Sequence, residues 1–238
     1  MRVSSGQAHP LRTLPDLEGD PRMPSFFGGK DRAGARAVAN ERISRHSSGW
    51  GQLLERLRTE ESLRVLDIGP TSSTNINFVT GLGHSIYLAN LAEDAARREW
   101  FILDEDGSSR FDVERFLGAH LNFSGRGFDI VLFWDTADYL PEELLGPVLE
   151  RIHDVTEPEG QMLAMFHSPA SASALGATNA GFCRYHLTDT NRVDMQRAGE
   201  YPLLNTYSNR QIENLLRSFK GFHFFLGKDN VREVVVTR

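Results

Sequence analysis

The fold of this chain is indicated by residues 64–75, which read Arg64-Val65-Leu66-Asp67-Ile68-Gly69-Pro70-Thr71-Ser72-Ser73-Thr74-Asn75. An apolar strand stops at an acid and a glycine, a loop of small residues follows, and hydroxyl side chains then favour the start of a helix. This order places a carboxylate and several backbone N–H groups at the carboxyl edge of a sheet. Open α/β folds bind their ligands at that edge, so we expect a ligand site at this loop.

Composition limits the classes to which the protein can belong. A chain of 238 residues, 40% of them hydrophobic, suits one α/β domain with decorations or two small domains. The net charge of −6 weighs against a dedicated nucleic-acid binder, which normally has a basic face. The single cysteine, Cys183, excludes an internal disulfide framework and fits a reducing, cytoplasmic location. The sequence shows no membrane span, no signal-peptide core and no metal-ligand spacing.

Strands and helices alternate along most of the chain. Apolar runs predict seven strands, at 63–68, 85–89, 111–113, 128–134, 161–166, 222–226 and 233–237. Helical patterns lie at 34–58 with a break at 47–49, and at 72–81, 95–101, 114–121, 141–153 and 208–219. This alternation predicts a Rossmann-like, doubly wound α/β fold whose mostly parallel, seven-stranded sheet ends in an antiparallel C-terminal hairpin.

Two segments interrupt this pattern. Residues 1–33 are rich in Pro, Gly, Ser and Arg, so we expect a disordered or loosely docked lead before a domain at 34–238. Within the lead, Phe26-Phe27 is either an anchor on the domain surface or a flap over the ligand. Residues of about 167–204 form a long irregular insertion with a hairpin around 185–195, and insertions of this length often act as lids or binding loops.

The order of these elements resembles that of the class I S-adenosylmethionine-dependent methyltransferases, over roughly residues 35–238. Four stretches carry the resemblance: Val65-Leu66-Asp67-Ile68-Gly69, which is similar to the first motif; Phe128-Asp129-Ile130-Val131-Leu132-Phe133-Trp134-Asp135, similar to the fourth strand and the polar residue after it; Glu159-Gly160-Gln161-Met162-Leu163, similar to the turn into the fifth strand; and the closing hairpin from Phe222 to Arg238. Thr71 and Ser73 stand where the family usually has glycine.

The resemblance implies that S-adenosylmethionine binds in a cleft at the carboxyl edge. The cofactor-binding residues that it implies are Asp67, Gly69, Pro70, Ser72, Asn75, Asn90, Asp112 and Asp135. Asn90 stands near the position of the carboxylate that holds the ribose hydroxyls, with Glu93 just beyond. Asp112 would meet the adenine amino group. For Asn75, and for Asn77 beside it, hydrogen bonding at the helix terminus is the alternative role.

Residues that could contact the methyl acceptor follow two of the predicted strands. Asp135, Asp138 and Tyr139 come directly after the strand at 128–134, so we expect one of the two acids to position an amine or hydroxyl. Tyr139 would contact the acceptor, or it would pack over the following helix. His167 follows the strand at 161–166 and His186 lies in the insertion. Either imidazole suits a general base, with a structural role as the alternative.

Three functions remain open from the sequence. The first is methyl transfer to a small-molecule or protein acceptor. The second is a non-catalytic binding or interaction module that keeps the methyltransferase fold, which Thr71, Ser73 and Asn90 motivate. The third is a nicotinamide-dependent dehydrogenase on a related sheet, but the stretch from Gly69 to Thr74 misses two of the three glycines of the dinucleotide fingerprint.

Overall fold

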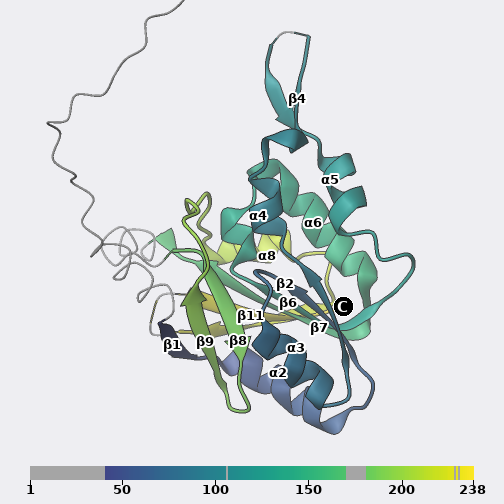
Figure 1. The fold of residues 1–238 in the computed structure, drawn as a ribbon, viewed down its shortest axis with the longest axis vertical. Coiled ribbons are helices and arrows are strands. Elements are labelled where there is room, and N and C mark those ends of the chain that lie inside the picture. The colour runs from purple at the N-terminus through teal and green to yellow at the C-terminus, as the bar shows by residue number, and fades with distance from the viewer. Residues whose placement is uncertain (1–40, 106, 170–180, 228, 230) are drawn as a thin grey trace, which may run out of the picture.

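A six-stranded, mixed sheet forms the centre of the described structure (Figure 1). The computed structural model describes residues 41–238 except 106, 170–180, 228 and 230, so the predicted lead with Phe26-Phe27 lies outside the described residues. The strands of the sheet run in the order β10-β11-β7-β6-β2-β3. Their bounds are β2 (Arg64–Ile68), β3 (Ser85–Ala89), β6 (Phe128–Trp134), β7 (Thr156–His167), β10 (Gly221–Leu226) and β11 (Val231–Thr237).

The direction of the strands follows from the helical connections. Strands β3, β2, β6 and β7 are parallel, whereas β11 runs antiparallel to β7 and β10 antiparallel to β11. The run at β6 is buried from Phe128 to Trp134 apart from Asp129, as expected for a central strand that is covered on both faces. The carboxyl ends of β2, β6 and β7 therefore meet at one edge of the sheet.

Helices cover both faces, as the predicted doubly wound fold requires. On one face lie α2 (Ser48–Thr59) and α3 (Ser73–Gly81), with Trp50, Leu53 and Val79 in the apolar cluster beneath them. The other face is covered by α4 (Leu91–Ala95), α5 (Val113–His120), α6 (Glu142–Val155) and α8 (Asn209–Leu215) (Figure 1). Side chains of these four helices, among them Phe116 and Leu144, form a second cluster.

A separate three-stranded antiparallel sheet lies beside α2 and α3. It consists of β1 (Arg42–His46), β9 (Arg192–Arg197) and β8 (Cys183–Leu187), in the order β1-β9-β8. The hairpin predicted around 185–195 is confirmed by the pairing of β8 with β9. The helix predicted from residue 34 is wrong at 42–46, because these residues extend along β9, a partner that lies far later in the chain. The predicted break is real, since Ser47 caps α2 through the backbone N–H of Trp50.

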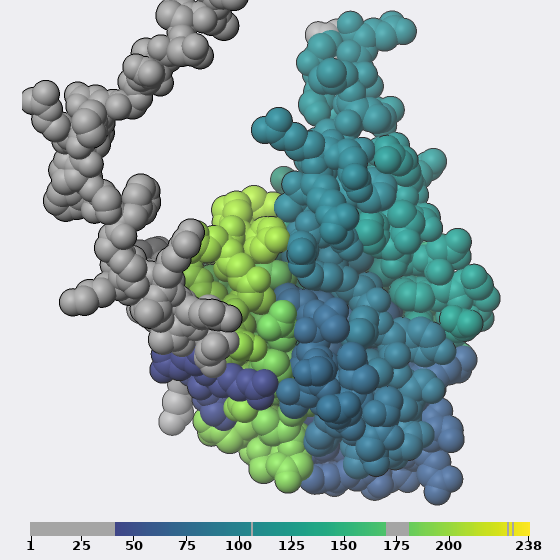
Figure 2. All heavy atoms as spheres, viewed as in Figure 1, coloured from purple at the N-terminus to yellow at the C-terminus, as the bar shows by residue number. Residues whose placement is uncertain are grey.

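The strand predicted at 111–113 does not join the central sheet, and only Phe111 of it lies in a strand. Residues Ser109–Phe111 (β5) pair instead with Phe101–Leu103 (β4), in a two-stranded hairpin that projects from the domain (Figure 2). Gly107, at a φ of 80°, makes the local turn that lets this pair form. The helix predicted at 95–101 is also wrong, because α4 ends at Ala95 and only the short 3₁₀ helix η1 (Arg98–Trp100) precedes β4.

Among the described residues, no helix combines the length and the apolar character that crossing a bilayer requires. Within the same ranges, no three His, Cys, Asp or Glu side chains gather closely enough to hold a metal ion.

Candidate functional site

Asp67 lies at the carboxyl end of β2 with only 3% of its surface exposed. Its two oxygens each accept one hydrogen bond: Oδ1 from Trp134 Nε1 at 2.7 Å, and Oδ2 from Asn75 Nδ2 at 2.8 Å. Burial raises the pKa of Asp67 to about 6, while the two hydrogen bonds act in the opposite direction. The carboxylate that opened the predicted motif is thus bound by side chains of its own chain.

Trp134 reaches Asp67 because its backbone turns sharply at the end of β6. Its φ is 49°, in the left-handed region that a bulky residue adopts at a cost of about 1–3 kcal/mol. The indole then passes close to Gly69, where a Cβ atom would come within 3.2 Å of Trp134 Cδ1. A glycine at position 69 therefore gives the indole room to approach Asp67.

The loop after β2 is covered by strand β8 of the insertion. Ser72 caps α3 by accepting the N–H of Asn75 at 3.2 Å, and its hydroxyl also lies 2.8 Å from His186 Nδ1. Asn75 donates from Nδ2 to the carbonyl of Tyr185 at 3.0 Å and accepts the N–H of Leu187 at 2.8 Å. Three of the polar groups predicted to meet a cofactor, those of Asp67, Ser72 and Asn75, are thus engaged within the chain.

The residues that replace the expected glycines do not fill this loop. Thr71 and Ser73 are both exposed, whereas Pro70 and Ser72 between and beside them are buried. The interior of the loop is closed by β8 and by Trp134, whose ring stacks on Tyr185 with centroids 4.7 Å apart. The side chains at positions 71 and 73 are therefore not what closes the loop.

A second group of ionisable side chains lies at the ends of β6 and β7. Asp138, on the 3₁₀ helix η2 (Thr136–Tyr139), is fully buried. Its Oδ2 accepts hydrogen bonds from the backbone N–H of His167 at 2.9 Å and from His167 Nδ1 at 2.6 Å. Its Oδ1 is also buried and accepts no hydrogen bond from the described residues. Asp135 lies one turn earlier and is 3% exposed.

Burial and mutual charge shift the pKa values of this group. Burial raises the pKa of Asp138 to about 7, although the hydrogen bond from His167 opposes the rise. Burial likewise raises the pKa of Asp135, against the charge of His167. Burial alone would lower the pKa of His167, but the hydrogen bond from its ring to Asp138 and the charges of both acids raise it overall. The cluster can therefore hold or release a proton near neutral pH.

The other candidates have structural partners. Tyr139 is 6% exposed and packs edge-on against Phe182 of the insertion, whereas the packing alternative had placed it over the following helix. His186 bonds Gln196 Oε1 through Nε2 at 3.0 Å, and burial lowers its pKa. Asp112 caps α5 by accepting the N–H of Arg115 at 3.3 Å, so it lies beyond the β4–β5 hairpin and outside the central sheet.

Asn90 retains a free acceptor at the end of β3. Its Nδ2 donates to Glu93 Oε2 at 2.5 Å, whereas its Oδ1 is buried and accepts no hydrogen bond from any residue that the structure describes. A buried amide oxygen without a donor costs free energy that a hydroxyl group could recover. The end of β3 is therefore suited to a hydroxyl-bearing ligand.

Sequence reasoning did not anticipate the roles of Trp134 and Tyr185. One local signal was present, because an indole N–H at the end of a fully apolar strand needs a buried acceptor. Asp67 is the acid that ends the neighbouring strand, and the parallel pairing of β2 with β6 brings the two together. No local pattern connects Tyr185 with Trp134, because the two residues belong to different sheets.

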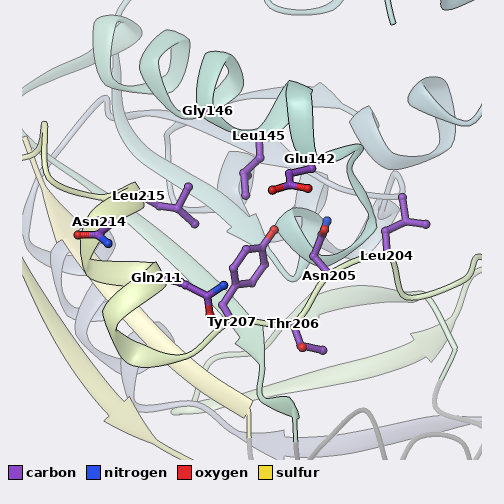
Figure 3. Close-up of a pocket in the computed structure, with 10 residues that line it drawn as sticks. All are labelled: Glu142, Leu145, Gly146, Leu204, Asn205, Thr206, Tyr207, Gln211, Asn214 and Leu215. Atoms are coloured by element: carbon purple, nitrogen blue, oxygen red, sulfur yellow. The ribbon is translucent and has the colours of Figure 1, made fainter. Parts of the chain in front are cut away.

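A cavity of about 630 Å³ opens between α6 and α8 (Figure 3). Figure 3 shows the ring of Tyr207 at its centre, with its hydroxyl directed towards Leu145 and Glu142 of α6. Two residues of the cavity wall are hydrogen-bonded to η2, since Tyr207 Oη and Asn205 Nδ2 both donate to the carbonyl of Ala137. The cavity therefore lies on the side of η2 that faces α6 and α8. Asp67, Asp135 and His167 do not line it.

The chain is similar to several solved methyltransferase structures. A 1,6-didemethyltoxoflavin N1-methyltransferase from Burkholderia thailandensis is 13% identical, with 87% of this chain and 83% of that one covered and a TM-score of 0.42. A TehB-like S-adenosylmethionine-dependent methyltransferase from Corynebacterium glutamicum is 12% identical, over 87% and 95%, with a TM-score of 0.44. The magnesium protoporphyrin IX methyltransferase from Synechocystis PCC 6803 is 11% identical, over 80% and 83%, with a TM-score of 0.43.

No family model matches the sequence, and no curated protein matches it. At the TM-scores and identities of the solved structures, the likeness carries no conclusion about activity. What the site can do follows from its own geometry.

Proposed function

We propose that this chain is an S-adenosylmethionine-dependent methyltransferase that acts on a small-molecule acceptor. The observation that carries the proposal is the buried pair of Asp138 and His167, with Asp135 one turn away, at the carboxyl ends of β6 and β7. Ligands of doubly wound sheets bind at this edge. Ionisable groups whose pKa values are shifted by burial and by each other are typical of functional sites.

The role of each side chain follows from its contacts. Asp138 fixes the ring of His167 through Nδ1, which leaves Nε2 as the nitrogen that can take a proton from an acceptor hydroxyl or amine. The negative charge of Asp135 raises the pKa of His167, and so helps the imidazole to hold that proton. When bound, the cofactor would supply a methyl group on a sulfonium centre. The chain would align the acceptor and exclude water.

The residues fit the cofactor at one end of the site. At the end of β3, the unbonded Oδ1 of Asn90 and the nearby Glu93 are suited to the two hydroxyls of a ribose. At the loop after β2, the groups of Ser72 and Asn75 already bond β8. Cofactor binding at the loop therefore requires β8 to move away from Ser72 and Asn75.

The same contacts favour a second candidate, a non-catalytic module that keeps the fold. In that case the hydrogen bond between Asp67 and Trp134 is never broken for a ligand. The same holds for the hydrogen bonds that join Ser72 and Asn75 to β8. The strained φ of Trp134 favours the enzyme, because such strain concentrates at functional sites. The two functions make opposite predictions for binding of the cofactor.

Isothermal titration calorimetry with S-adenosylmethionine and S-adenosylhomocysteine tests the proposal. We expect both to bind, and Asn90→Ala to weaken binding by roughly tenfold, which corresponds to about 1.4 kcal/mol for a lost hydrogen bond. Asn77→Ala is the control, because Asn77 is exposed on α3. No binding of either compound at millimolar concentration would leave the non-catalytic module as the function. Tighter binding of a nicotinamide dinucleotide would indicate a dehydrogenase.

A separate labelling experiment tests whether the methyl acceptor is a small molecule or a protein. The protein is incubated with methyl-labelled S-adenosylmethionine and a cell extract, which is then separated into small molecules and proteins. Label in the small-molecule fraction that decreases with His167→Asn supports the proposal. Label in the protein fraction points to a protein acceptor.

A further inference from the structure

The cavity between α6 and α8 has the size of a ligand site that the proposed methyl transfer does not use. Its volume of about 630 Å³ lies within the usual range for sites of small organic molecules. All the residues that line it belong to the described part of the chain. We propose that this cavity binds a small organic amine, whose ammonium group is held by Glu142, Asn205 and Tyr207. The apolar body of the amine then lies against Leu145 and Leu215.

One wall of the cavity is held in place by hydrogen bonds to η2 and to the end of β7. The backbone N–H groups of Leu204 and Asn205 both donate to the carbonyl of Asp138, at 2.9 and 3.0 Å. The backbone N–H of Tyr207 donates to the carbonyl of His167 at 3.1 Å. This wall is therefore fixed before any ligand arrives, as is usual for small-molecule sites.

The hydrogen bonds made by this wall leave acceptor atoms over. Asn205 donates from Nδ2 to the carbonyls of Ala137 and Leu140, at 3.3 and 2.7 Å, so Oδ1 is the part of its amide that remains for a ligand. Tyr207 Oη donates its proton to the carbonyl of Ala137 at 3.2 Å, so its oxygen can only accept a further bond. The carboxylate of Glu142 has no hydrogen bond or ion pair with any residue that the structure describes.

These three acceptors lie on one side of the cavity. Figure 3 shows the hydroxyl of Tyr207 directed towards Glu142, with the side chain of Asn205 next to it. Burial, Asp138 and Glu142, in that order, raise the pKa of Tyr207, so the charge of Glu142 reaches this hydroxyl. An ammonium group has three N–H donors and no acceptor. It therefore matches a set of three acceptors of which one is negatively charged.

The lining favours a cation over an anion. Among the described residues that line the cavity there is no Lys, Arg or His, and Glu142 is the one carboxylate. A phosphate or carboxylate ligand would lie near Glu142 without a cation to compensate it, which costs free energy. The charge of the lining therefore selects an amine.

Apolar side chains lie beside the three acceptors. Leu145 is buried and Leu215 is half-buried, and Figure 3 shows both next to the ring of Tyr207. Gly146 lines the same part of the cavity, and a Cβ atom there would meet nothing within 4 Å outside its own helix backbone. This part of the cavity is therefore open space with an apolar side, and it suits a hydrocarbon or aromatic body.

A titration with three compounds of the same body tests the proposal. Phenethylamine, phenethyl alcohol and 3-phenylpropionate differ in whether the end of the chain is an ammonium, a hydroxyl or a carboxylate. Binding is followed by NMR through the backbone amides of the full chain, and the shifts should centre on Gly146, Thr206 and Leu215. We expect the amine to bind at least about tenfold more tightly than the alcohol, which corresponds to about 1.4 kcal/mol, and the carboxylate to bind most weakly.

Two pairs of variants assign the binding to this cavity. Glu142→Gln should lower the affinity for the amine about tenfold and leave that for the alcohol unchanged. Glu143→Gln is the matched control, because Glu143 is the exposed neighbour that does not line the cavity. Gly146→Leu should fill the open space and weaken binding of both compounds. Its control is Gly118→Leu on α5, where an added Cβ atom also meets nothing within 4 Å.

Several results would overturn the proposal. They are an absence of shifts at millimolar amine, equal affinities for the amine and the alcohol, and equal effects of the two variants in either pair. Loss of amine binding in His167→Asn would also overturn it, because the amine would then lie in the proposed methyl-transfer site. None of these titrations contains S-adenosylmethionine, so failure of the proposed methyl transfer would leave this test intact.

Discussion

The indole of Trp134 and the phenol of Tyr185 stack face to face, with ring centroids 4.7 Å apart and planes within 3° of parallel. Trp134 ends a strand of the central sheet, and Tyr185 lies in the middle of β8 in the insertion. Both rings are buried, so this contact joins the six-stranded central sheet to the three-stranded sheet through their aromatic faces. The insertion is therefore part of the core at this point.

Removal of the Tyr185 ring should destabilise the fold strongly. Tyr185→Ala leaves a cavity beside Trp134, for which we expect a loss of about 3–5 kcal/mol in the free energy of unfolding. Tyr185→Phe keeps the ring but loses the buried hydroxyl, which acts to lower the pKa of Asp135, so its loss should be about 1–2 kcal/mol. Urea denaturation measures both. Equal effects would show that the hydroxyl, and not the stack, is what matters.

Substitution of Asn75 should destabilise the fold far more than substitution of Asn77 on the same helix. Asn75→Ala removes partners from Asp67, the Tyr185 carbonyl and the Leu187 N–H, all of them buried, so we expect a loss of about 2–4 kcal/mol. Asn77 is exposed, and Asn77→Ala should change stability by less than about 0.5 kcal/mol. Denaturation gives the energies, and hydrogen exchange should show faster exchange at Leu187 in the Asn75 variant alone.

Asp67 should make the protein less stable as the pH rises. Its pKa is about 6 in the folded chain against an ordinary value of 3.8, so between these values the folded state binds more protons than the unfolded state. The free energy of unfolding should fall across this window by up to about 3 kcal/mol, at about 1.4 kcal/mol per pKa unit. Asp67→Asn should remove this contribution and leave the fall that the raised pKa values of Asp135 and Asp138 produce, as urea titrations at several pH values would reveal. An unchanged slope would contradict a raised pKa at this site.

The pKa of His167 should depend on the carboxylate of Asp138. Asp138→Asn removes the carboxylate that raises the pKa of His167 most, and leaves burial, which lowers it, against the more weakly raising charge of Asp135. We therefore expect the pKa of this imidazole to fall relative to the unmodified chain, as followed by NMR titration. The signal of His186, which bonds Gln196 and Ser72, should not change and serves as the internal control. A constant His167 titration would remove the support for a coupled pair.

Arg45 joins the small sheet to the end of the central one. It forms ion pairs with Glu233 and Asp229, and only 8% of its surface is exposed. Arg45→Met leaves Glu233 buried without its cation, so we expect a loss of about 3–5 kcal/mol. Arg42→Met on the same strand is the matched control and should cost less than about 1 kcal/mol, because Arg42 is exposed. Denaturation of the two variants under identical conditions decides the prediction.

The parts of the fold that were predictable from sequence are those with a local physical cause. The apolar run of β6, the cap at Ser72 and the turn-bounded strands of the C-terminal hairpin all have local signals, and the structure has strands or helices at each. Strand β1 has no such signal, because its extended form depends on pairing with β9. The strand predicted at 111–113 is formed by residues 109–111, and the sequence does not specify whether its partner is β3 or β4.

The site shows the same division. Asp67, Asp135 and His167 were found because each lies at or directly after the carboxyl end of a buried strand, and the parallel sheet brings such ends together. The partners of Asp67 could not be found in this way. Trp134 reaches it by an unusual backbone turn, and β8 reaches Asn75 from an insertion whose path no periodicity defines. Long-range packing, and not propensity, decides which of these groups remain free to bind a ligand.

The pairing of β1 with β9 has a consequence for how the chain folds. Arg42 lies opposite Gln196, so the small sheet joins a strand near the start of the described chain to one near its end. Contacts between residues so distant in sequence require the closure of a long loop, which slows their formation relative to local helices and turns. During synthesis the central strands β2, β3 and β6 would be available well before β9 emerges. The covering of the Asp67 loop should therefore form after the pairing of β2, β3 and β6, and refolding followed at Trp134 should show a phase slower than the formation of helices.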